Sequence, residues 1–483
     1  MVIDALKYQI LQQFGFVPTE EQGQALDAFA RFLTDRDPDA VMILRGSAGT
    51  GKTSLSGAIV RTLKAIRQKV MLLAPTGRAA KVFSLNSGCP AYTIHRRIYR
   101  EKSFAGVDGQ FNLNDNLFTD TLFMVDEASM ISNLGLGGGN FGSGCLLDDL
   151  VRFVYQGHND RLMLIGDKAQ LPPVGEEESP ALNRMMLEGY GLKVYECDLN
   201  EVLRQSQESG ILYNATVIRQ MITHDDITQL PLIRFKGFAD IVMMPGNELV
   251  ESLANSYYRV GQDETMVITR SNKRANIYNN GIRNMVLDRE EELSCGDMLM
   301  IVKNNYFWTE KERNEVKEAL NAIPPFLANG DRAKVLRVSR HMELYGFRFA
   351  TLLLQFPDYD NYEMSVTALL DTLQSEAPAL THEQQEQLFH GVEEDYQDVP
   401  LKADRMKTIR GDQYFNALQV KYAYAITCHK AQGGQWEHVY VDQGYMTDDM
   451  LTPDYIHWLY TAFTRAKDKL FLVNWPKTQT EQA

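Results

Sequence analysis

Residues 46–53 read Gly46-Ser-Ala-Gly49-Thr-Gly51-Lys52-Thr53, the full spacing of the pattern G-x-x-x-x-G-K-[ST]. The apolar run 41–44 before it predicts a buried strand, and residues 54–67 after it predict a helix. Glycines permit the tight turn that points backbone N–H groups at a polyphosphate, and the helix N-terminus adds partial positive charge. Lys52 can reach the β- and γ-phosphates, and the Thr53 hydroxyl can ligate Mg²⁺. The stretch predicts a phosphate-binding loop, with a chance glycine-rich turn as the alternative.

The composition is that of a globular protein with several domains. The chain has 483 residues, of which 44% are hydrophobic and 23% charged, and two to four domains are expected. No apolar run approaches the roughly 18 residues of a membrane span, and the N-terminal residues do not resemble a signal peptide. The five cysteines are scattered without a C-x-x-C pair, which argues against a disulfide framework or a zinc site. We expect a cytoplasmic protein with reduced cysteines.

The charge distribution restricts how a nucleic acid can bind. The net charge is −14, which by itself disfavours such a partner. Residues 371–398 hold eight acids and no lysine or arginine, so the rest of the chain is closer to neutral. This run is either a helix with a charged solvent face or a solvated excursion, and a binding tail is the alternative. Any contact with DNA must therefore be local.

Short apolar strands alternate with helical stretches in the first part of the chain. The expected strands are 41–44, 70–73, 122–125 and 162–165. This alternation predicts a doubly wound parallel sheet, in which ligands bind at the carboxyl ends of the strands. The polar segments that follow these strands should therefore converge on one edge: 46–53, 75–81, 126–127 and 166–170.

The second part of the chain predicts a split α/β domain with a β insertion. The expected strands of this domain are 241–244, 266–269, 423–427, 439–442 and 470–473. Between about 296 and 400, residues 298–302, 333–338 and 349–354 predict antiparallel strands, with turns at 329–331 and 358–361. We interpret this stretch as a small inserted β-barrel. A glycine-rich stretch at 135–144 is either a flexible surface loop or a mobile element near a ligand.

Two further segments carry groups suited to nucleotide chemistry. Asp126-Glu127 ends an apolar strand, where Asp126 can hold Mg²⁺ through water and Glu127 can polarise an attacking water. Gln170 follows the next strand and is suited to sensing a γ-phosphate, with a purely structural turn as the alternative.

With these residues the chain resembles a superfamily 1 DNA helicase of the RecD-like group, over nearly its whole length and in the family's motif order. The Q motif corresponds to Pro18-Thr-Glu-Glu-Gln22, motif I to 46–53, motif Ia to 74–81, a DNA-binding motif to 93–96, motif II to 126–130, motif III to 166–173, motif IV to 199–205, motif V to 424–433 and motif VI to 460–466.

The resemblance implies ATP and Mg²⁺ as cofactors, with single-stranded DNA and duplex junctions as partners. It implies catalytic roles for Lys52, Glu127, Gln170, Arg204 and Arg465, and metal binding by Thr53 and Asp126. The implied nucleotide-binding residues are Gln22, Gly46, Ser47, Ala48, Gly49, Thr50, Gly51, Lys52, Thr53, Gln432 and Gly433. The implied DNA-binding residues are Thr76, Arg78, Lys81, His95, Thr427 and His429. Arginines that clamp a nucleotide from the second domain would make hydrolysis depend on closure.

We therefore expect an α/β fold of two RecA-like P-loop domains with an inserted SH3-like barrel. The expected boundaries are 1–195 for the first domain, with a small insertion at about 96–120, 196–295 and 401–483 for the second, and 296–400 for the barrel. The expected function is an ATP-dependent helicase, for which the family suggests 5′→3′ travel. Two alternatives remain open: an ATPase that remodels proteins without unwinding, and a nucleic-acid-binding scaffold with an inactive ATPase site.

Overall fold

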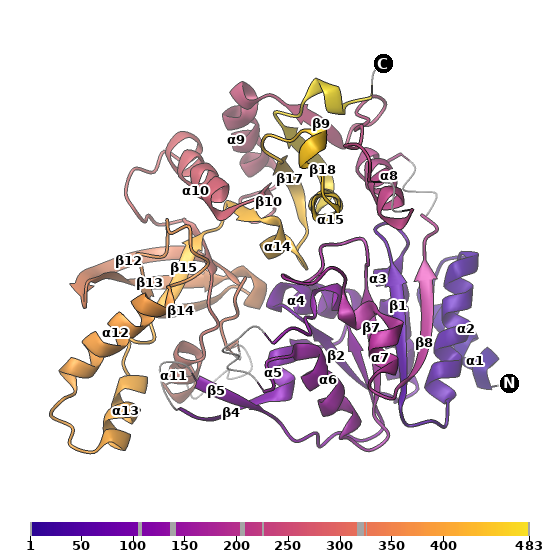
Figure 1. The fold of residues 1–483 in the computed structure, drawn as a ribbon, viewed down its shortest axis with the longest axis horizontal. Helices are drawn as coiled ribbons and strands as arrows, with labels where there is room; N and C mark the ends of the chain where they lie inside the picture. Colours follow the sequence, from indigo (N-terminus) through magenta and orange to yellow (C-terminus); the bar gives the residue numbers. More distant parts are fainter. Residues whose placement is uncertain are drawn as a thin grey trace.

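Two parallel β-sheets and a closed five-stranded barrel form the framework of the molecule (Figure 1). The computed structural model describes residues 2–104, 109–135, 142–202, 208–224, 227–315, 323–324 and 326–481. The expected fold class, two RecA-like sheets with an inserted barrel, is confirmed.

The first sheet has the strand order β3-β2-β6-β7-β1-β8, and every neighbouring pair is parallel. Its strands are β1 (Ala40–Gly46), β2 (Lys69–Ala74), β3 (Ala91–Thr93), β6 (Thr121–Val125), β7 (Arg161–Gly166) and β8 (Lys193–Leu199). The helices around it are α1 (Val2–Phe14), α2 (Glu20–Thr34), α3 (Lys52–Ala65), α4 (Gly77–Ser87), α5 (Ile94–Ile98), α6 (Leu146–Tyr155) and α7 (Arg184–Glu188).

Helices cover both faces of this sheet because its strands are apolar on both sides. In β1, Met42 and Leu44 belong to the core under α1, α2 and α3, whereas Val41 and Ile43 belong to the opposite core with α5, α6 and α7. Alternate side chains of a strand point to opposite faces, so a continuous apolar run fits a strand buried on both sides.

A two-stranded antiparallel hairpin projects between α5 and β6. It consists of β4 (Tyr99–Phe104) and β5 (Gly109–Leu113) and coincides with the small insertion expected at about 96–120.

The second sheet has the order β16-β10-β17-β18-β9 and is also parallel. Its strands are β9 (Ile241–Met244), β10 (Thr265–Thr269), β16 (Ala425–Thr427), β17 (Trp436–Asp442) and β18 (Ala466–Val473). Its helices are α8 (Gly210–Thr223), α9 (Leu249–Arg259), α10 (Asn272–Gly281), α14 (Cys428–Ala431) and α15 (Pro453–Phe463). We call the parts of the chain built on the first and second sheets the first and second units.

The barrel lies between the two halves of the second unit in sequence. It is formed by β11 (Met298–Ile301), β12 (Arg332–Leu344), β13 (Phe347–Phe356), β14 (Tyr362–Leu369) and β15 (Leu418–Tyr422), with α11 (Phe307–Glu315) between β11 and β12. Tyr345 and Gly346, both with positive φ, form the turn between β12 and β13. Asp360 and Asn361, also with positive φ, lie in the predicted turn before β14. The hairpin β12–β13 is longer than the sequence predicts.

Two helices between β14 and β15, α12 (His382–Asp395) and α13 (Lys402–Arg410), extend from the barrel (Figure 1). Leu388, Val392 and Ile409 are buried in a small separate core with Phe347 and Phe349 of β13. The acidic run is thus largely an amphipathic helix that turns its charged side to solvent.

Two strands cross or lie beyond the domain boundaries expected from the sequence. Strand β8 of the first sheet passes through the expected boundary at 195, and β15 of the barrel lies beyond the boundary at 400. We propose that the first unit extends to about residue 199 and that the barrel ends at about residue 422.

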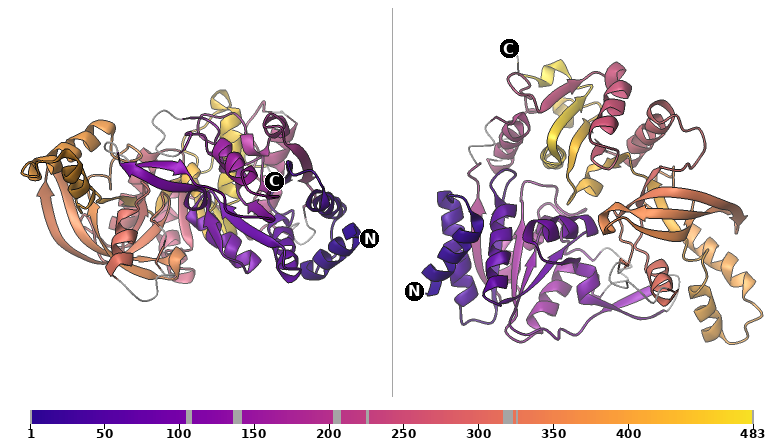
Figure 2. Two further views of the ribbon diagram at one scale, coloured as in Figure 1. Left: turned by 90° about the horizontal axis from the view of Figure 1, so that it is seen from below. Right: turned by 180° about the vertical axis from the view of Figure 1, so that it is seen from behind.

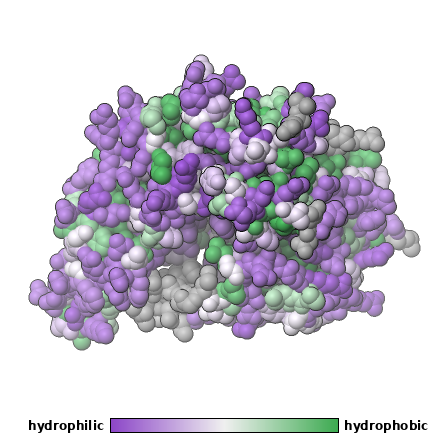
Figure 3. All heavy atoms as spheres, turned by 45° about the horizontal axis from the view of Figure 1, so that its top comes forward, coloured by the Kyte–Doolittle hydropathy of each residue, from purple (hydrophilic) through white to green (hydrophobic). Residues whose placement is uncertain are grey.

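The two units face each other, and the barrel lies beside both (Figures 1 and 2). The face shown in Figure 3 is mostly hydrophilic, with hydrophobic residues scattered over it. Among the described helices, none has the length and apolarity that a membrane crossing requires.

Candidate functional site

The loop 46–53 joins β1 to α3, as the sequence predicts. Gly49 and Gly51 have φ of 79° and 77°, a backbone region that favours glycine. A Cβ at Gly49 would lie 3.3 Å from the Leu212 side chain on α8, so this glycine also permits close approach of the second unit. The Lys52 Nζ donates to the Gly46 carbonyl oxygen at 3.1 Å, which keeps the ammonium inside the loop.

Asp126 and Glu127 directly follow β6. The Glu127 N–H donates to Asp126 Oδ1 at 2.9 Å, and Glu127 itself has a φ of 52°. Burial and the neighbouring Glu127 carboxylate raise the pKa of Asp126 to about 6, although the Lys52 ammonium lowers it. A carboxylate that is costly to ionise in the protein alone is a favourable place for a cation.

Gln170 connects the two units across the site. In the amide orientation that satisfies both neighbours, its nitrogen donates to Glu127 Oε2 at 3.3 Å and its oxygen accepts from Arg465 Nη2 at 3.2 Å. Arg465 is buried and also donates to the carbonyl oxygens of Thr461 and Gly434. Glu127, Gln170 and Arg465, predicted separately from three motifs, are thus hydrogen-bonded in one chain.

A cavity of about 740 Å³ lies between the two units at this point. The first unit contributes the phosphate loop, Asp126, Glu127 and Gln170, and the second contributes α8 and the start of β18. The predicted residues that line the cavity are Ser47, Ala48, Gly49, Gly51, Lys52, Thr53, Asp126, Glu127, Gln170 and Arg465. A ligand here would touch both units, so its contacts with the second unit would depend on closure.

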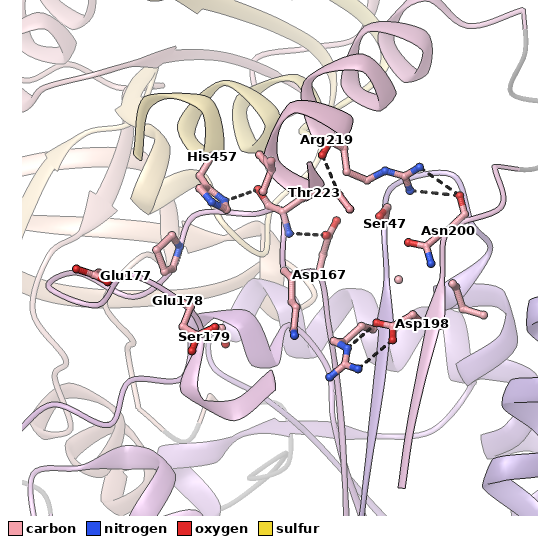
Figure 4. A pocket seen from close by; sticks show the side chains of 17 residues that line it. Ser47, Asp167, Glu177, Glu178, Ser179, Asp198, Asn200, Arg219, Thr223 and His457 are labelled. Atoms are coloured by element: carbon pink, nitrogen blue, oxygen red, sulfur yellow. Dashed lines mark hydrogen bonds and ion pairs between the residues drawn. The ribbon is translucent and has the colours of Figure 1, made fainter. Parts of the chain in front are cut away.

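A second, smaller cavity of about 490 Å³ adjoins the first and shares Ser47 and Asp167 with it (Figure 4). Arg219 of α8 reaches the Asn200 carbonyl oxygen in this cavity, with both guanidinium nitrogens at 3.3 Å. Gly46 lines this cavity, not the larger one.

Gln22 contacts the phosphate loop directly. Its Nε2 donates to the Thr50 carbonyl oxygen at 2.8 Å, and its Oε1 accepts from the Thr19 N–H in the capping box that begins α2. Both ends of this buried amide are therefore occupied, and it does not line the larger cavity. In this arrangement Gln22 supports the phosphate loop through the Thr50 carbonyl oxygen.

Gln432 and Gly433 lie at the contact between the units, outside the lining of the larger cavity. The Gln432 Nε2 donates to the Leu171 carbonyl oxygen at 2.7 Å. Gly433 has a φ of 72°, and a Cβ there would lie 3.1 Å from Thr76 Oγ1.

The two basic residues predicted on α4 contact the barrel. The Lys81 Nζ donates to the Pro357 carbonyl oxygen at 2.6 Å, and Asp358 Oδ1 lies 3.7 Å from Arg78 Nη1 and 4.0 Å from Lys81 Nζ. Arg78 also donates to the Gln435 carbonyl oxygen at 2.7 Å. Both side chains are therefore engaged by the short turn Pro357–Tyr359 (η6).

The remaining predicted DNA contacts are spread over both units. The Thr76 hydroxyl accepts from the Ala79 N–H and caps α4. His95 lies on α5 beside Tyr99, with ring centroids 5.7 Å apart, and burial lowers its pKa to about 4. Thr427 directly precedes α14, and His429 lies on that helix. The His429 side chain is partly exposed, and the burial of its remaining surface lowers its pKa. Arg204 and residues 136–141 lie outside the described residues.

The chain matches two family models in order. An AAA domain matches residues 19–220, and a UvrD-like helicase C-terminal domain matches residues 422–473. The chain is 30% identical to the ATP-dependent RecD2 DNA helicase of Deinococcus radiodurans over 157 residues, 32% of this chain and 18% of that protein. Over these segments the chain is similar to helicases of the RecD-like group of superfamily 1.

Other comparisons give partial or distant similarity. It is 33% identical over 171 residues to an uncharacterized protein of Methanocaldococcus jannaschii, 33% of this chain and 14% of the other. The matched segments thus span less than a fifth of these two relatives' length. A Pif1 helicase from Bacteroides, solved with ADP-AlF3 and single-stranded DNA, is 14% identical with a TM-score of 0.45, covering 97% of this chain and 95% of that one.

Several residues at this candidate site were not predicted from the sequence. His457, Tyr460 and Thr461 of α15 hydrogen-bond to the segment 166–173 or to the phosphate loop, and Asp358 faces the motif Ia cations. Tyr460 and Thr461 stand inside the quoted motif VI, so their position beside Arg465 was an available signal. Asp358 carries no motif, and nothing local indicates its partners.

Proposed function

We propose that this chain is an ATP-dependent DNA helicase that moves along single-stranded DNA, with 5′→3′ travel as the family suggests. The observation that carries the proposal is the hydrogen-bonded chain Glu127–Gln170–Arg465, which spans the cavity between the two units. A nucleotide in this cavity would touch the phosphate loop on one side and an arginine on the other. Hydrolysis would then open and close the units, the motion that a translocating motor needs.

The site residues have distinct proposed roles. Lys52 would bind the β- and γ-phosphates, and Glu127 would accept a proton from the attacking water. Gln170 would report the γ-phosphate to Arg465, whose planar guanidinium suits a phosphate. Arg204 would supply a second cation from the second unit. Gln22 would support the loop through the Thr50 carbonyl oxygen.

Thr53 and Asp126 are the residues that would hold Mg²⁺. The raised pKa of Asp126 and the lining position of both residues fit this role. A bound Mg²⁺ would neutralise phosphate charge, and nucleotide and water oxygens would complete its coordination.

The proposed DNA path runs past Thr76, Arg78, Lys81 and His95 of the first unit and Thr427 and His429 of the second. Hydroxyl, imidazole and basic groups contact phosphates locally, which suits an acidic protein. Duplex junctions are the proposed substrate, and the β4–β5 hairpin is the candidate for separating strands.

Steady-state ATPase activity with and without single-stranded DNA tests this proposal. We expect turnover that requires Mg²⁺ and rises at least severalfold with the DNA, and Lys52→Ala should abolish it in a folded protein. Turnover that does not respond to DNA would favour a protein-remodelling ATPase. DNA binding without turnover would indicate a scaffold with an inactive site.

A further inference from the structure

The Tyr460 hydroxyl joins the second unit to the phosphate loop. It accepts from the Ala48 N–H at 3.0 Å and donates to Asp167 Oδ2 at 2.7 Å. Tyr460 is 1% exposed and Asp167 4% exposed, so the bond between them is shielded from solvent, whereas Ala48 is half-buried. A backbone N–H of the phosphate loop and the carboxylate that follows β7 are thus both bonded to one atom of α15.

Arg465 follows the end of α15, and its side chain is hydrogen-bonded to the last turn of that helix and to Thr464. The Arg465 Nε donates to the Thr461 carbonyl oxygen at 3.0 Å, and its Nη2 donates to Thr464 Oγ1 at 3.1 Å. The guanidinium is therefore tied to the end of α15. The position of α15 relative to the phosphate loop sets where Arg465 lies relative to a bound nucleotide.

Further bonds hold α15 to the segment after β7. The Leu171 N–H donates to Thr461 Oγ1 at 2.8 Å, and His457 Nδ1 lies 2.9 Å from the Ala169 carbonyl oxygen (Figure 4). Tyr460 differs from these residues because it also reaches the phosphate loop itself.

We propose that Tyr460 is a positioning residue for ATP hydrolysis, which rests on the function proposed above. Its hydroxyl fixes α15 against Ala48 and Asp167, and this fixes the register of Arg465 across the nucleotide cavity. Removal of the hydroxyl leaves the Ala48 N–H and Asp167 Oδ2 without this partner, and among the described residues Asp167 then keeps only the Ala169 N–H on Oδ1. The closed arrangement therefore becomes less favourable. The effect falls on the rate of hydrolysis, because Arg465 acts most strongly on the charge of the transition state.

Tyr455 provides a matched control on the same helix. It is also buried, and its hydroxyl donates to Gln443 Oε1, within the second unit. Tyr455→Phe thus removes a buried hydroxyl from α15 without touching the phosphate loop. Tyr460→Phe makes the same chemical change at the contact between units.

The experiment measures kcat and the Kd for ATP in the full chain with saturating single-stranded DNA. Tyr460→Phe is expected to lower kcat by about ten- to a hundredfold. Its Kd for ATP should stay within about threefold of wild type, while Tyr455→Phe keeps kcat within about twofold. Thermal melting establishes that both variants are folded.

A double variant separates positioning from simple stability. If Tyr460 acts through Arg465, Tyr460→Phe with Arg465→Ala should be about as slow as Arg465→Ala alone. Additive losses, equal effects of the two tyrosine variants, or full activity of a folded Tyr460→Phe would each overturn the proposal. Absence of ATPase activity in wild type would instead contradict the proposed function itself.

Discussion

At the residue scale, Glu127 is the group whose chemistry is most specific. It follows β6, lines the cavity and is bonded to Gln170, which in turn is bonded to Arg465. Glu127→Gln keeps the shape of the side chain but cannot take up a proton. We expect ATP binding within about threefold of wild type and a loss of turnover of at least about a hundredfold, measured by equilibrium binding and single-turnover hydrolysis. If ATP binding falls as much as turnover, Glu127 has a structural or metal-binding role and is not the proton acceptor.

Asp126 yields a prediction about pH and stability. Its pKa in the folded protein is raised from 3.8 to about 6 by burial and by Glu127, so folding favours the protonated form. Stability therefore falls as the pH rises from about 4 to 6, and the ionised side chain costs most above pH 6. Asp126→Asn stays neutral, so without nucleotide and Mg²⁺ it should be the more stable protein at pH 8.

Urea unfolding of wild type and Asp126→Asn at two pH values tests this prediction. The advantage of Asp126→Asn should be larger at pH 8 than at pH 5, by about 1 kcal/mol. The same difference at both pH values would show that the carboxylate is not costly to ionise.

Sequence reasoning located the phosphate loop and the residues 126, 127 and 170 that line the cavity because their motifs are local. The loop 46–53 and the pair Asp126-Glu127 lie where parallel strands end, and this is a general property of such sheets. Contacts between distant segments were not accessible in the same way. Gln22 is predicted to contact adenine, but its hydrogen bonds to Thr19 and Thr50 depend on the packing of α2 against the loop and were not predicted from the sequence.

At the element scale, the η6 turn (Pro357–Tyr359) covers the motif Ia cations of α4. Asp358 is largely buried near Arg78 and Lys81 at 3.7 and 4.0 Å, and its Oδ2 has no hydrogen-bond partner among the described residues. The carboxylate is thus held by charge and not by fitted hydrogen bonds. A DNA phosphate can accept hydrogen bonds from the same cations through both of its non-bridging oxygens and would compete with Asp358.

Asp358→Asn should therefore strengthen binding of single-stranded DNA. We expect a Kd about three- to tenfold lower at low salt, measured by fluorescence anisotropy, with a smaller gain at high salt. Asp360→Asn is the control, because Asp360 is exposed in the adjoining turn and its substitution removes the same charge. Equal effects of the two variants, or weaker binding by Asp358→Asn, would contradict the competition.

Elements with strong periodicity were predicted better than those set by tertiary packing. The five strands expected in the second sheet exist, although β16 begins only at Ala425 because residues 418–422 close the barrel as β15. The barrel strand β12 runs to Leu344, and the turn at Tyr345 and Gly346 was missed because Gly346 is its only turn signal and Tyr345 is typical of a strand. The small core under α12 forms only when distant β13 residues meet it.

At the scale of the whole molecule, two units close on one cavity while the barrel touches the first unit at motif Ia. Side chains from both units line the cavity, and the α15 contacts make the phosphate loop part of the interface. Local sequence patterns predict each unit but not the interface between them, because this interface joins residues hundreds of positions apart in the sequence. On the proposed function, nucleotide and DNA would both contact this interface, so that binding of one would affect the other.

Strand separation on tailed duplexes tests the central claim most directly. The substrates are one duplex with a 5′ single-stranded tail and one with a 3′ tail, each incubated with the full chain, Mg²⁺ and ATP. The account predicts separation of the 5′-tailed duplex that requires ATP hydrolysis and is lost in Lys52→Ala, with little separation of the 3′-tailed one. Separation of only the 3′-tailed duplex would reverse the proposed direction. Failure to separate either duplex, in a protein whose ATPase does not respond to single-stranded DNA, would contradict the helicase account.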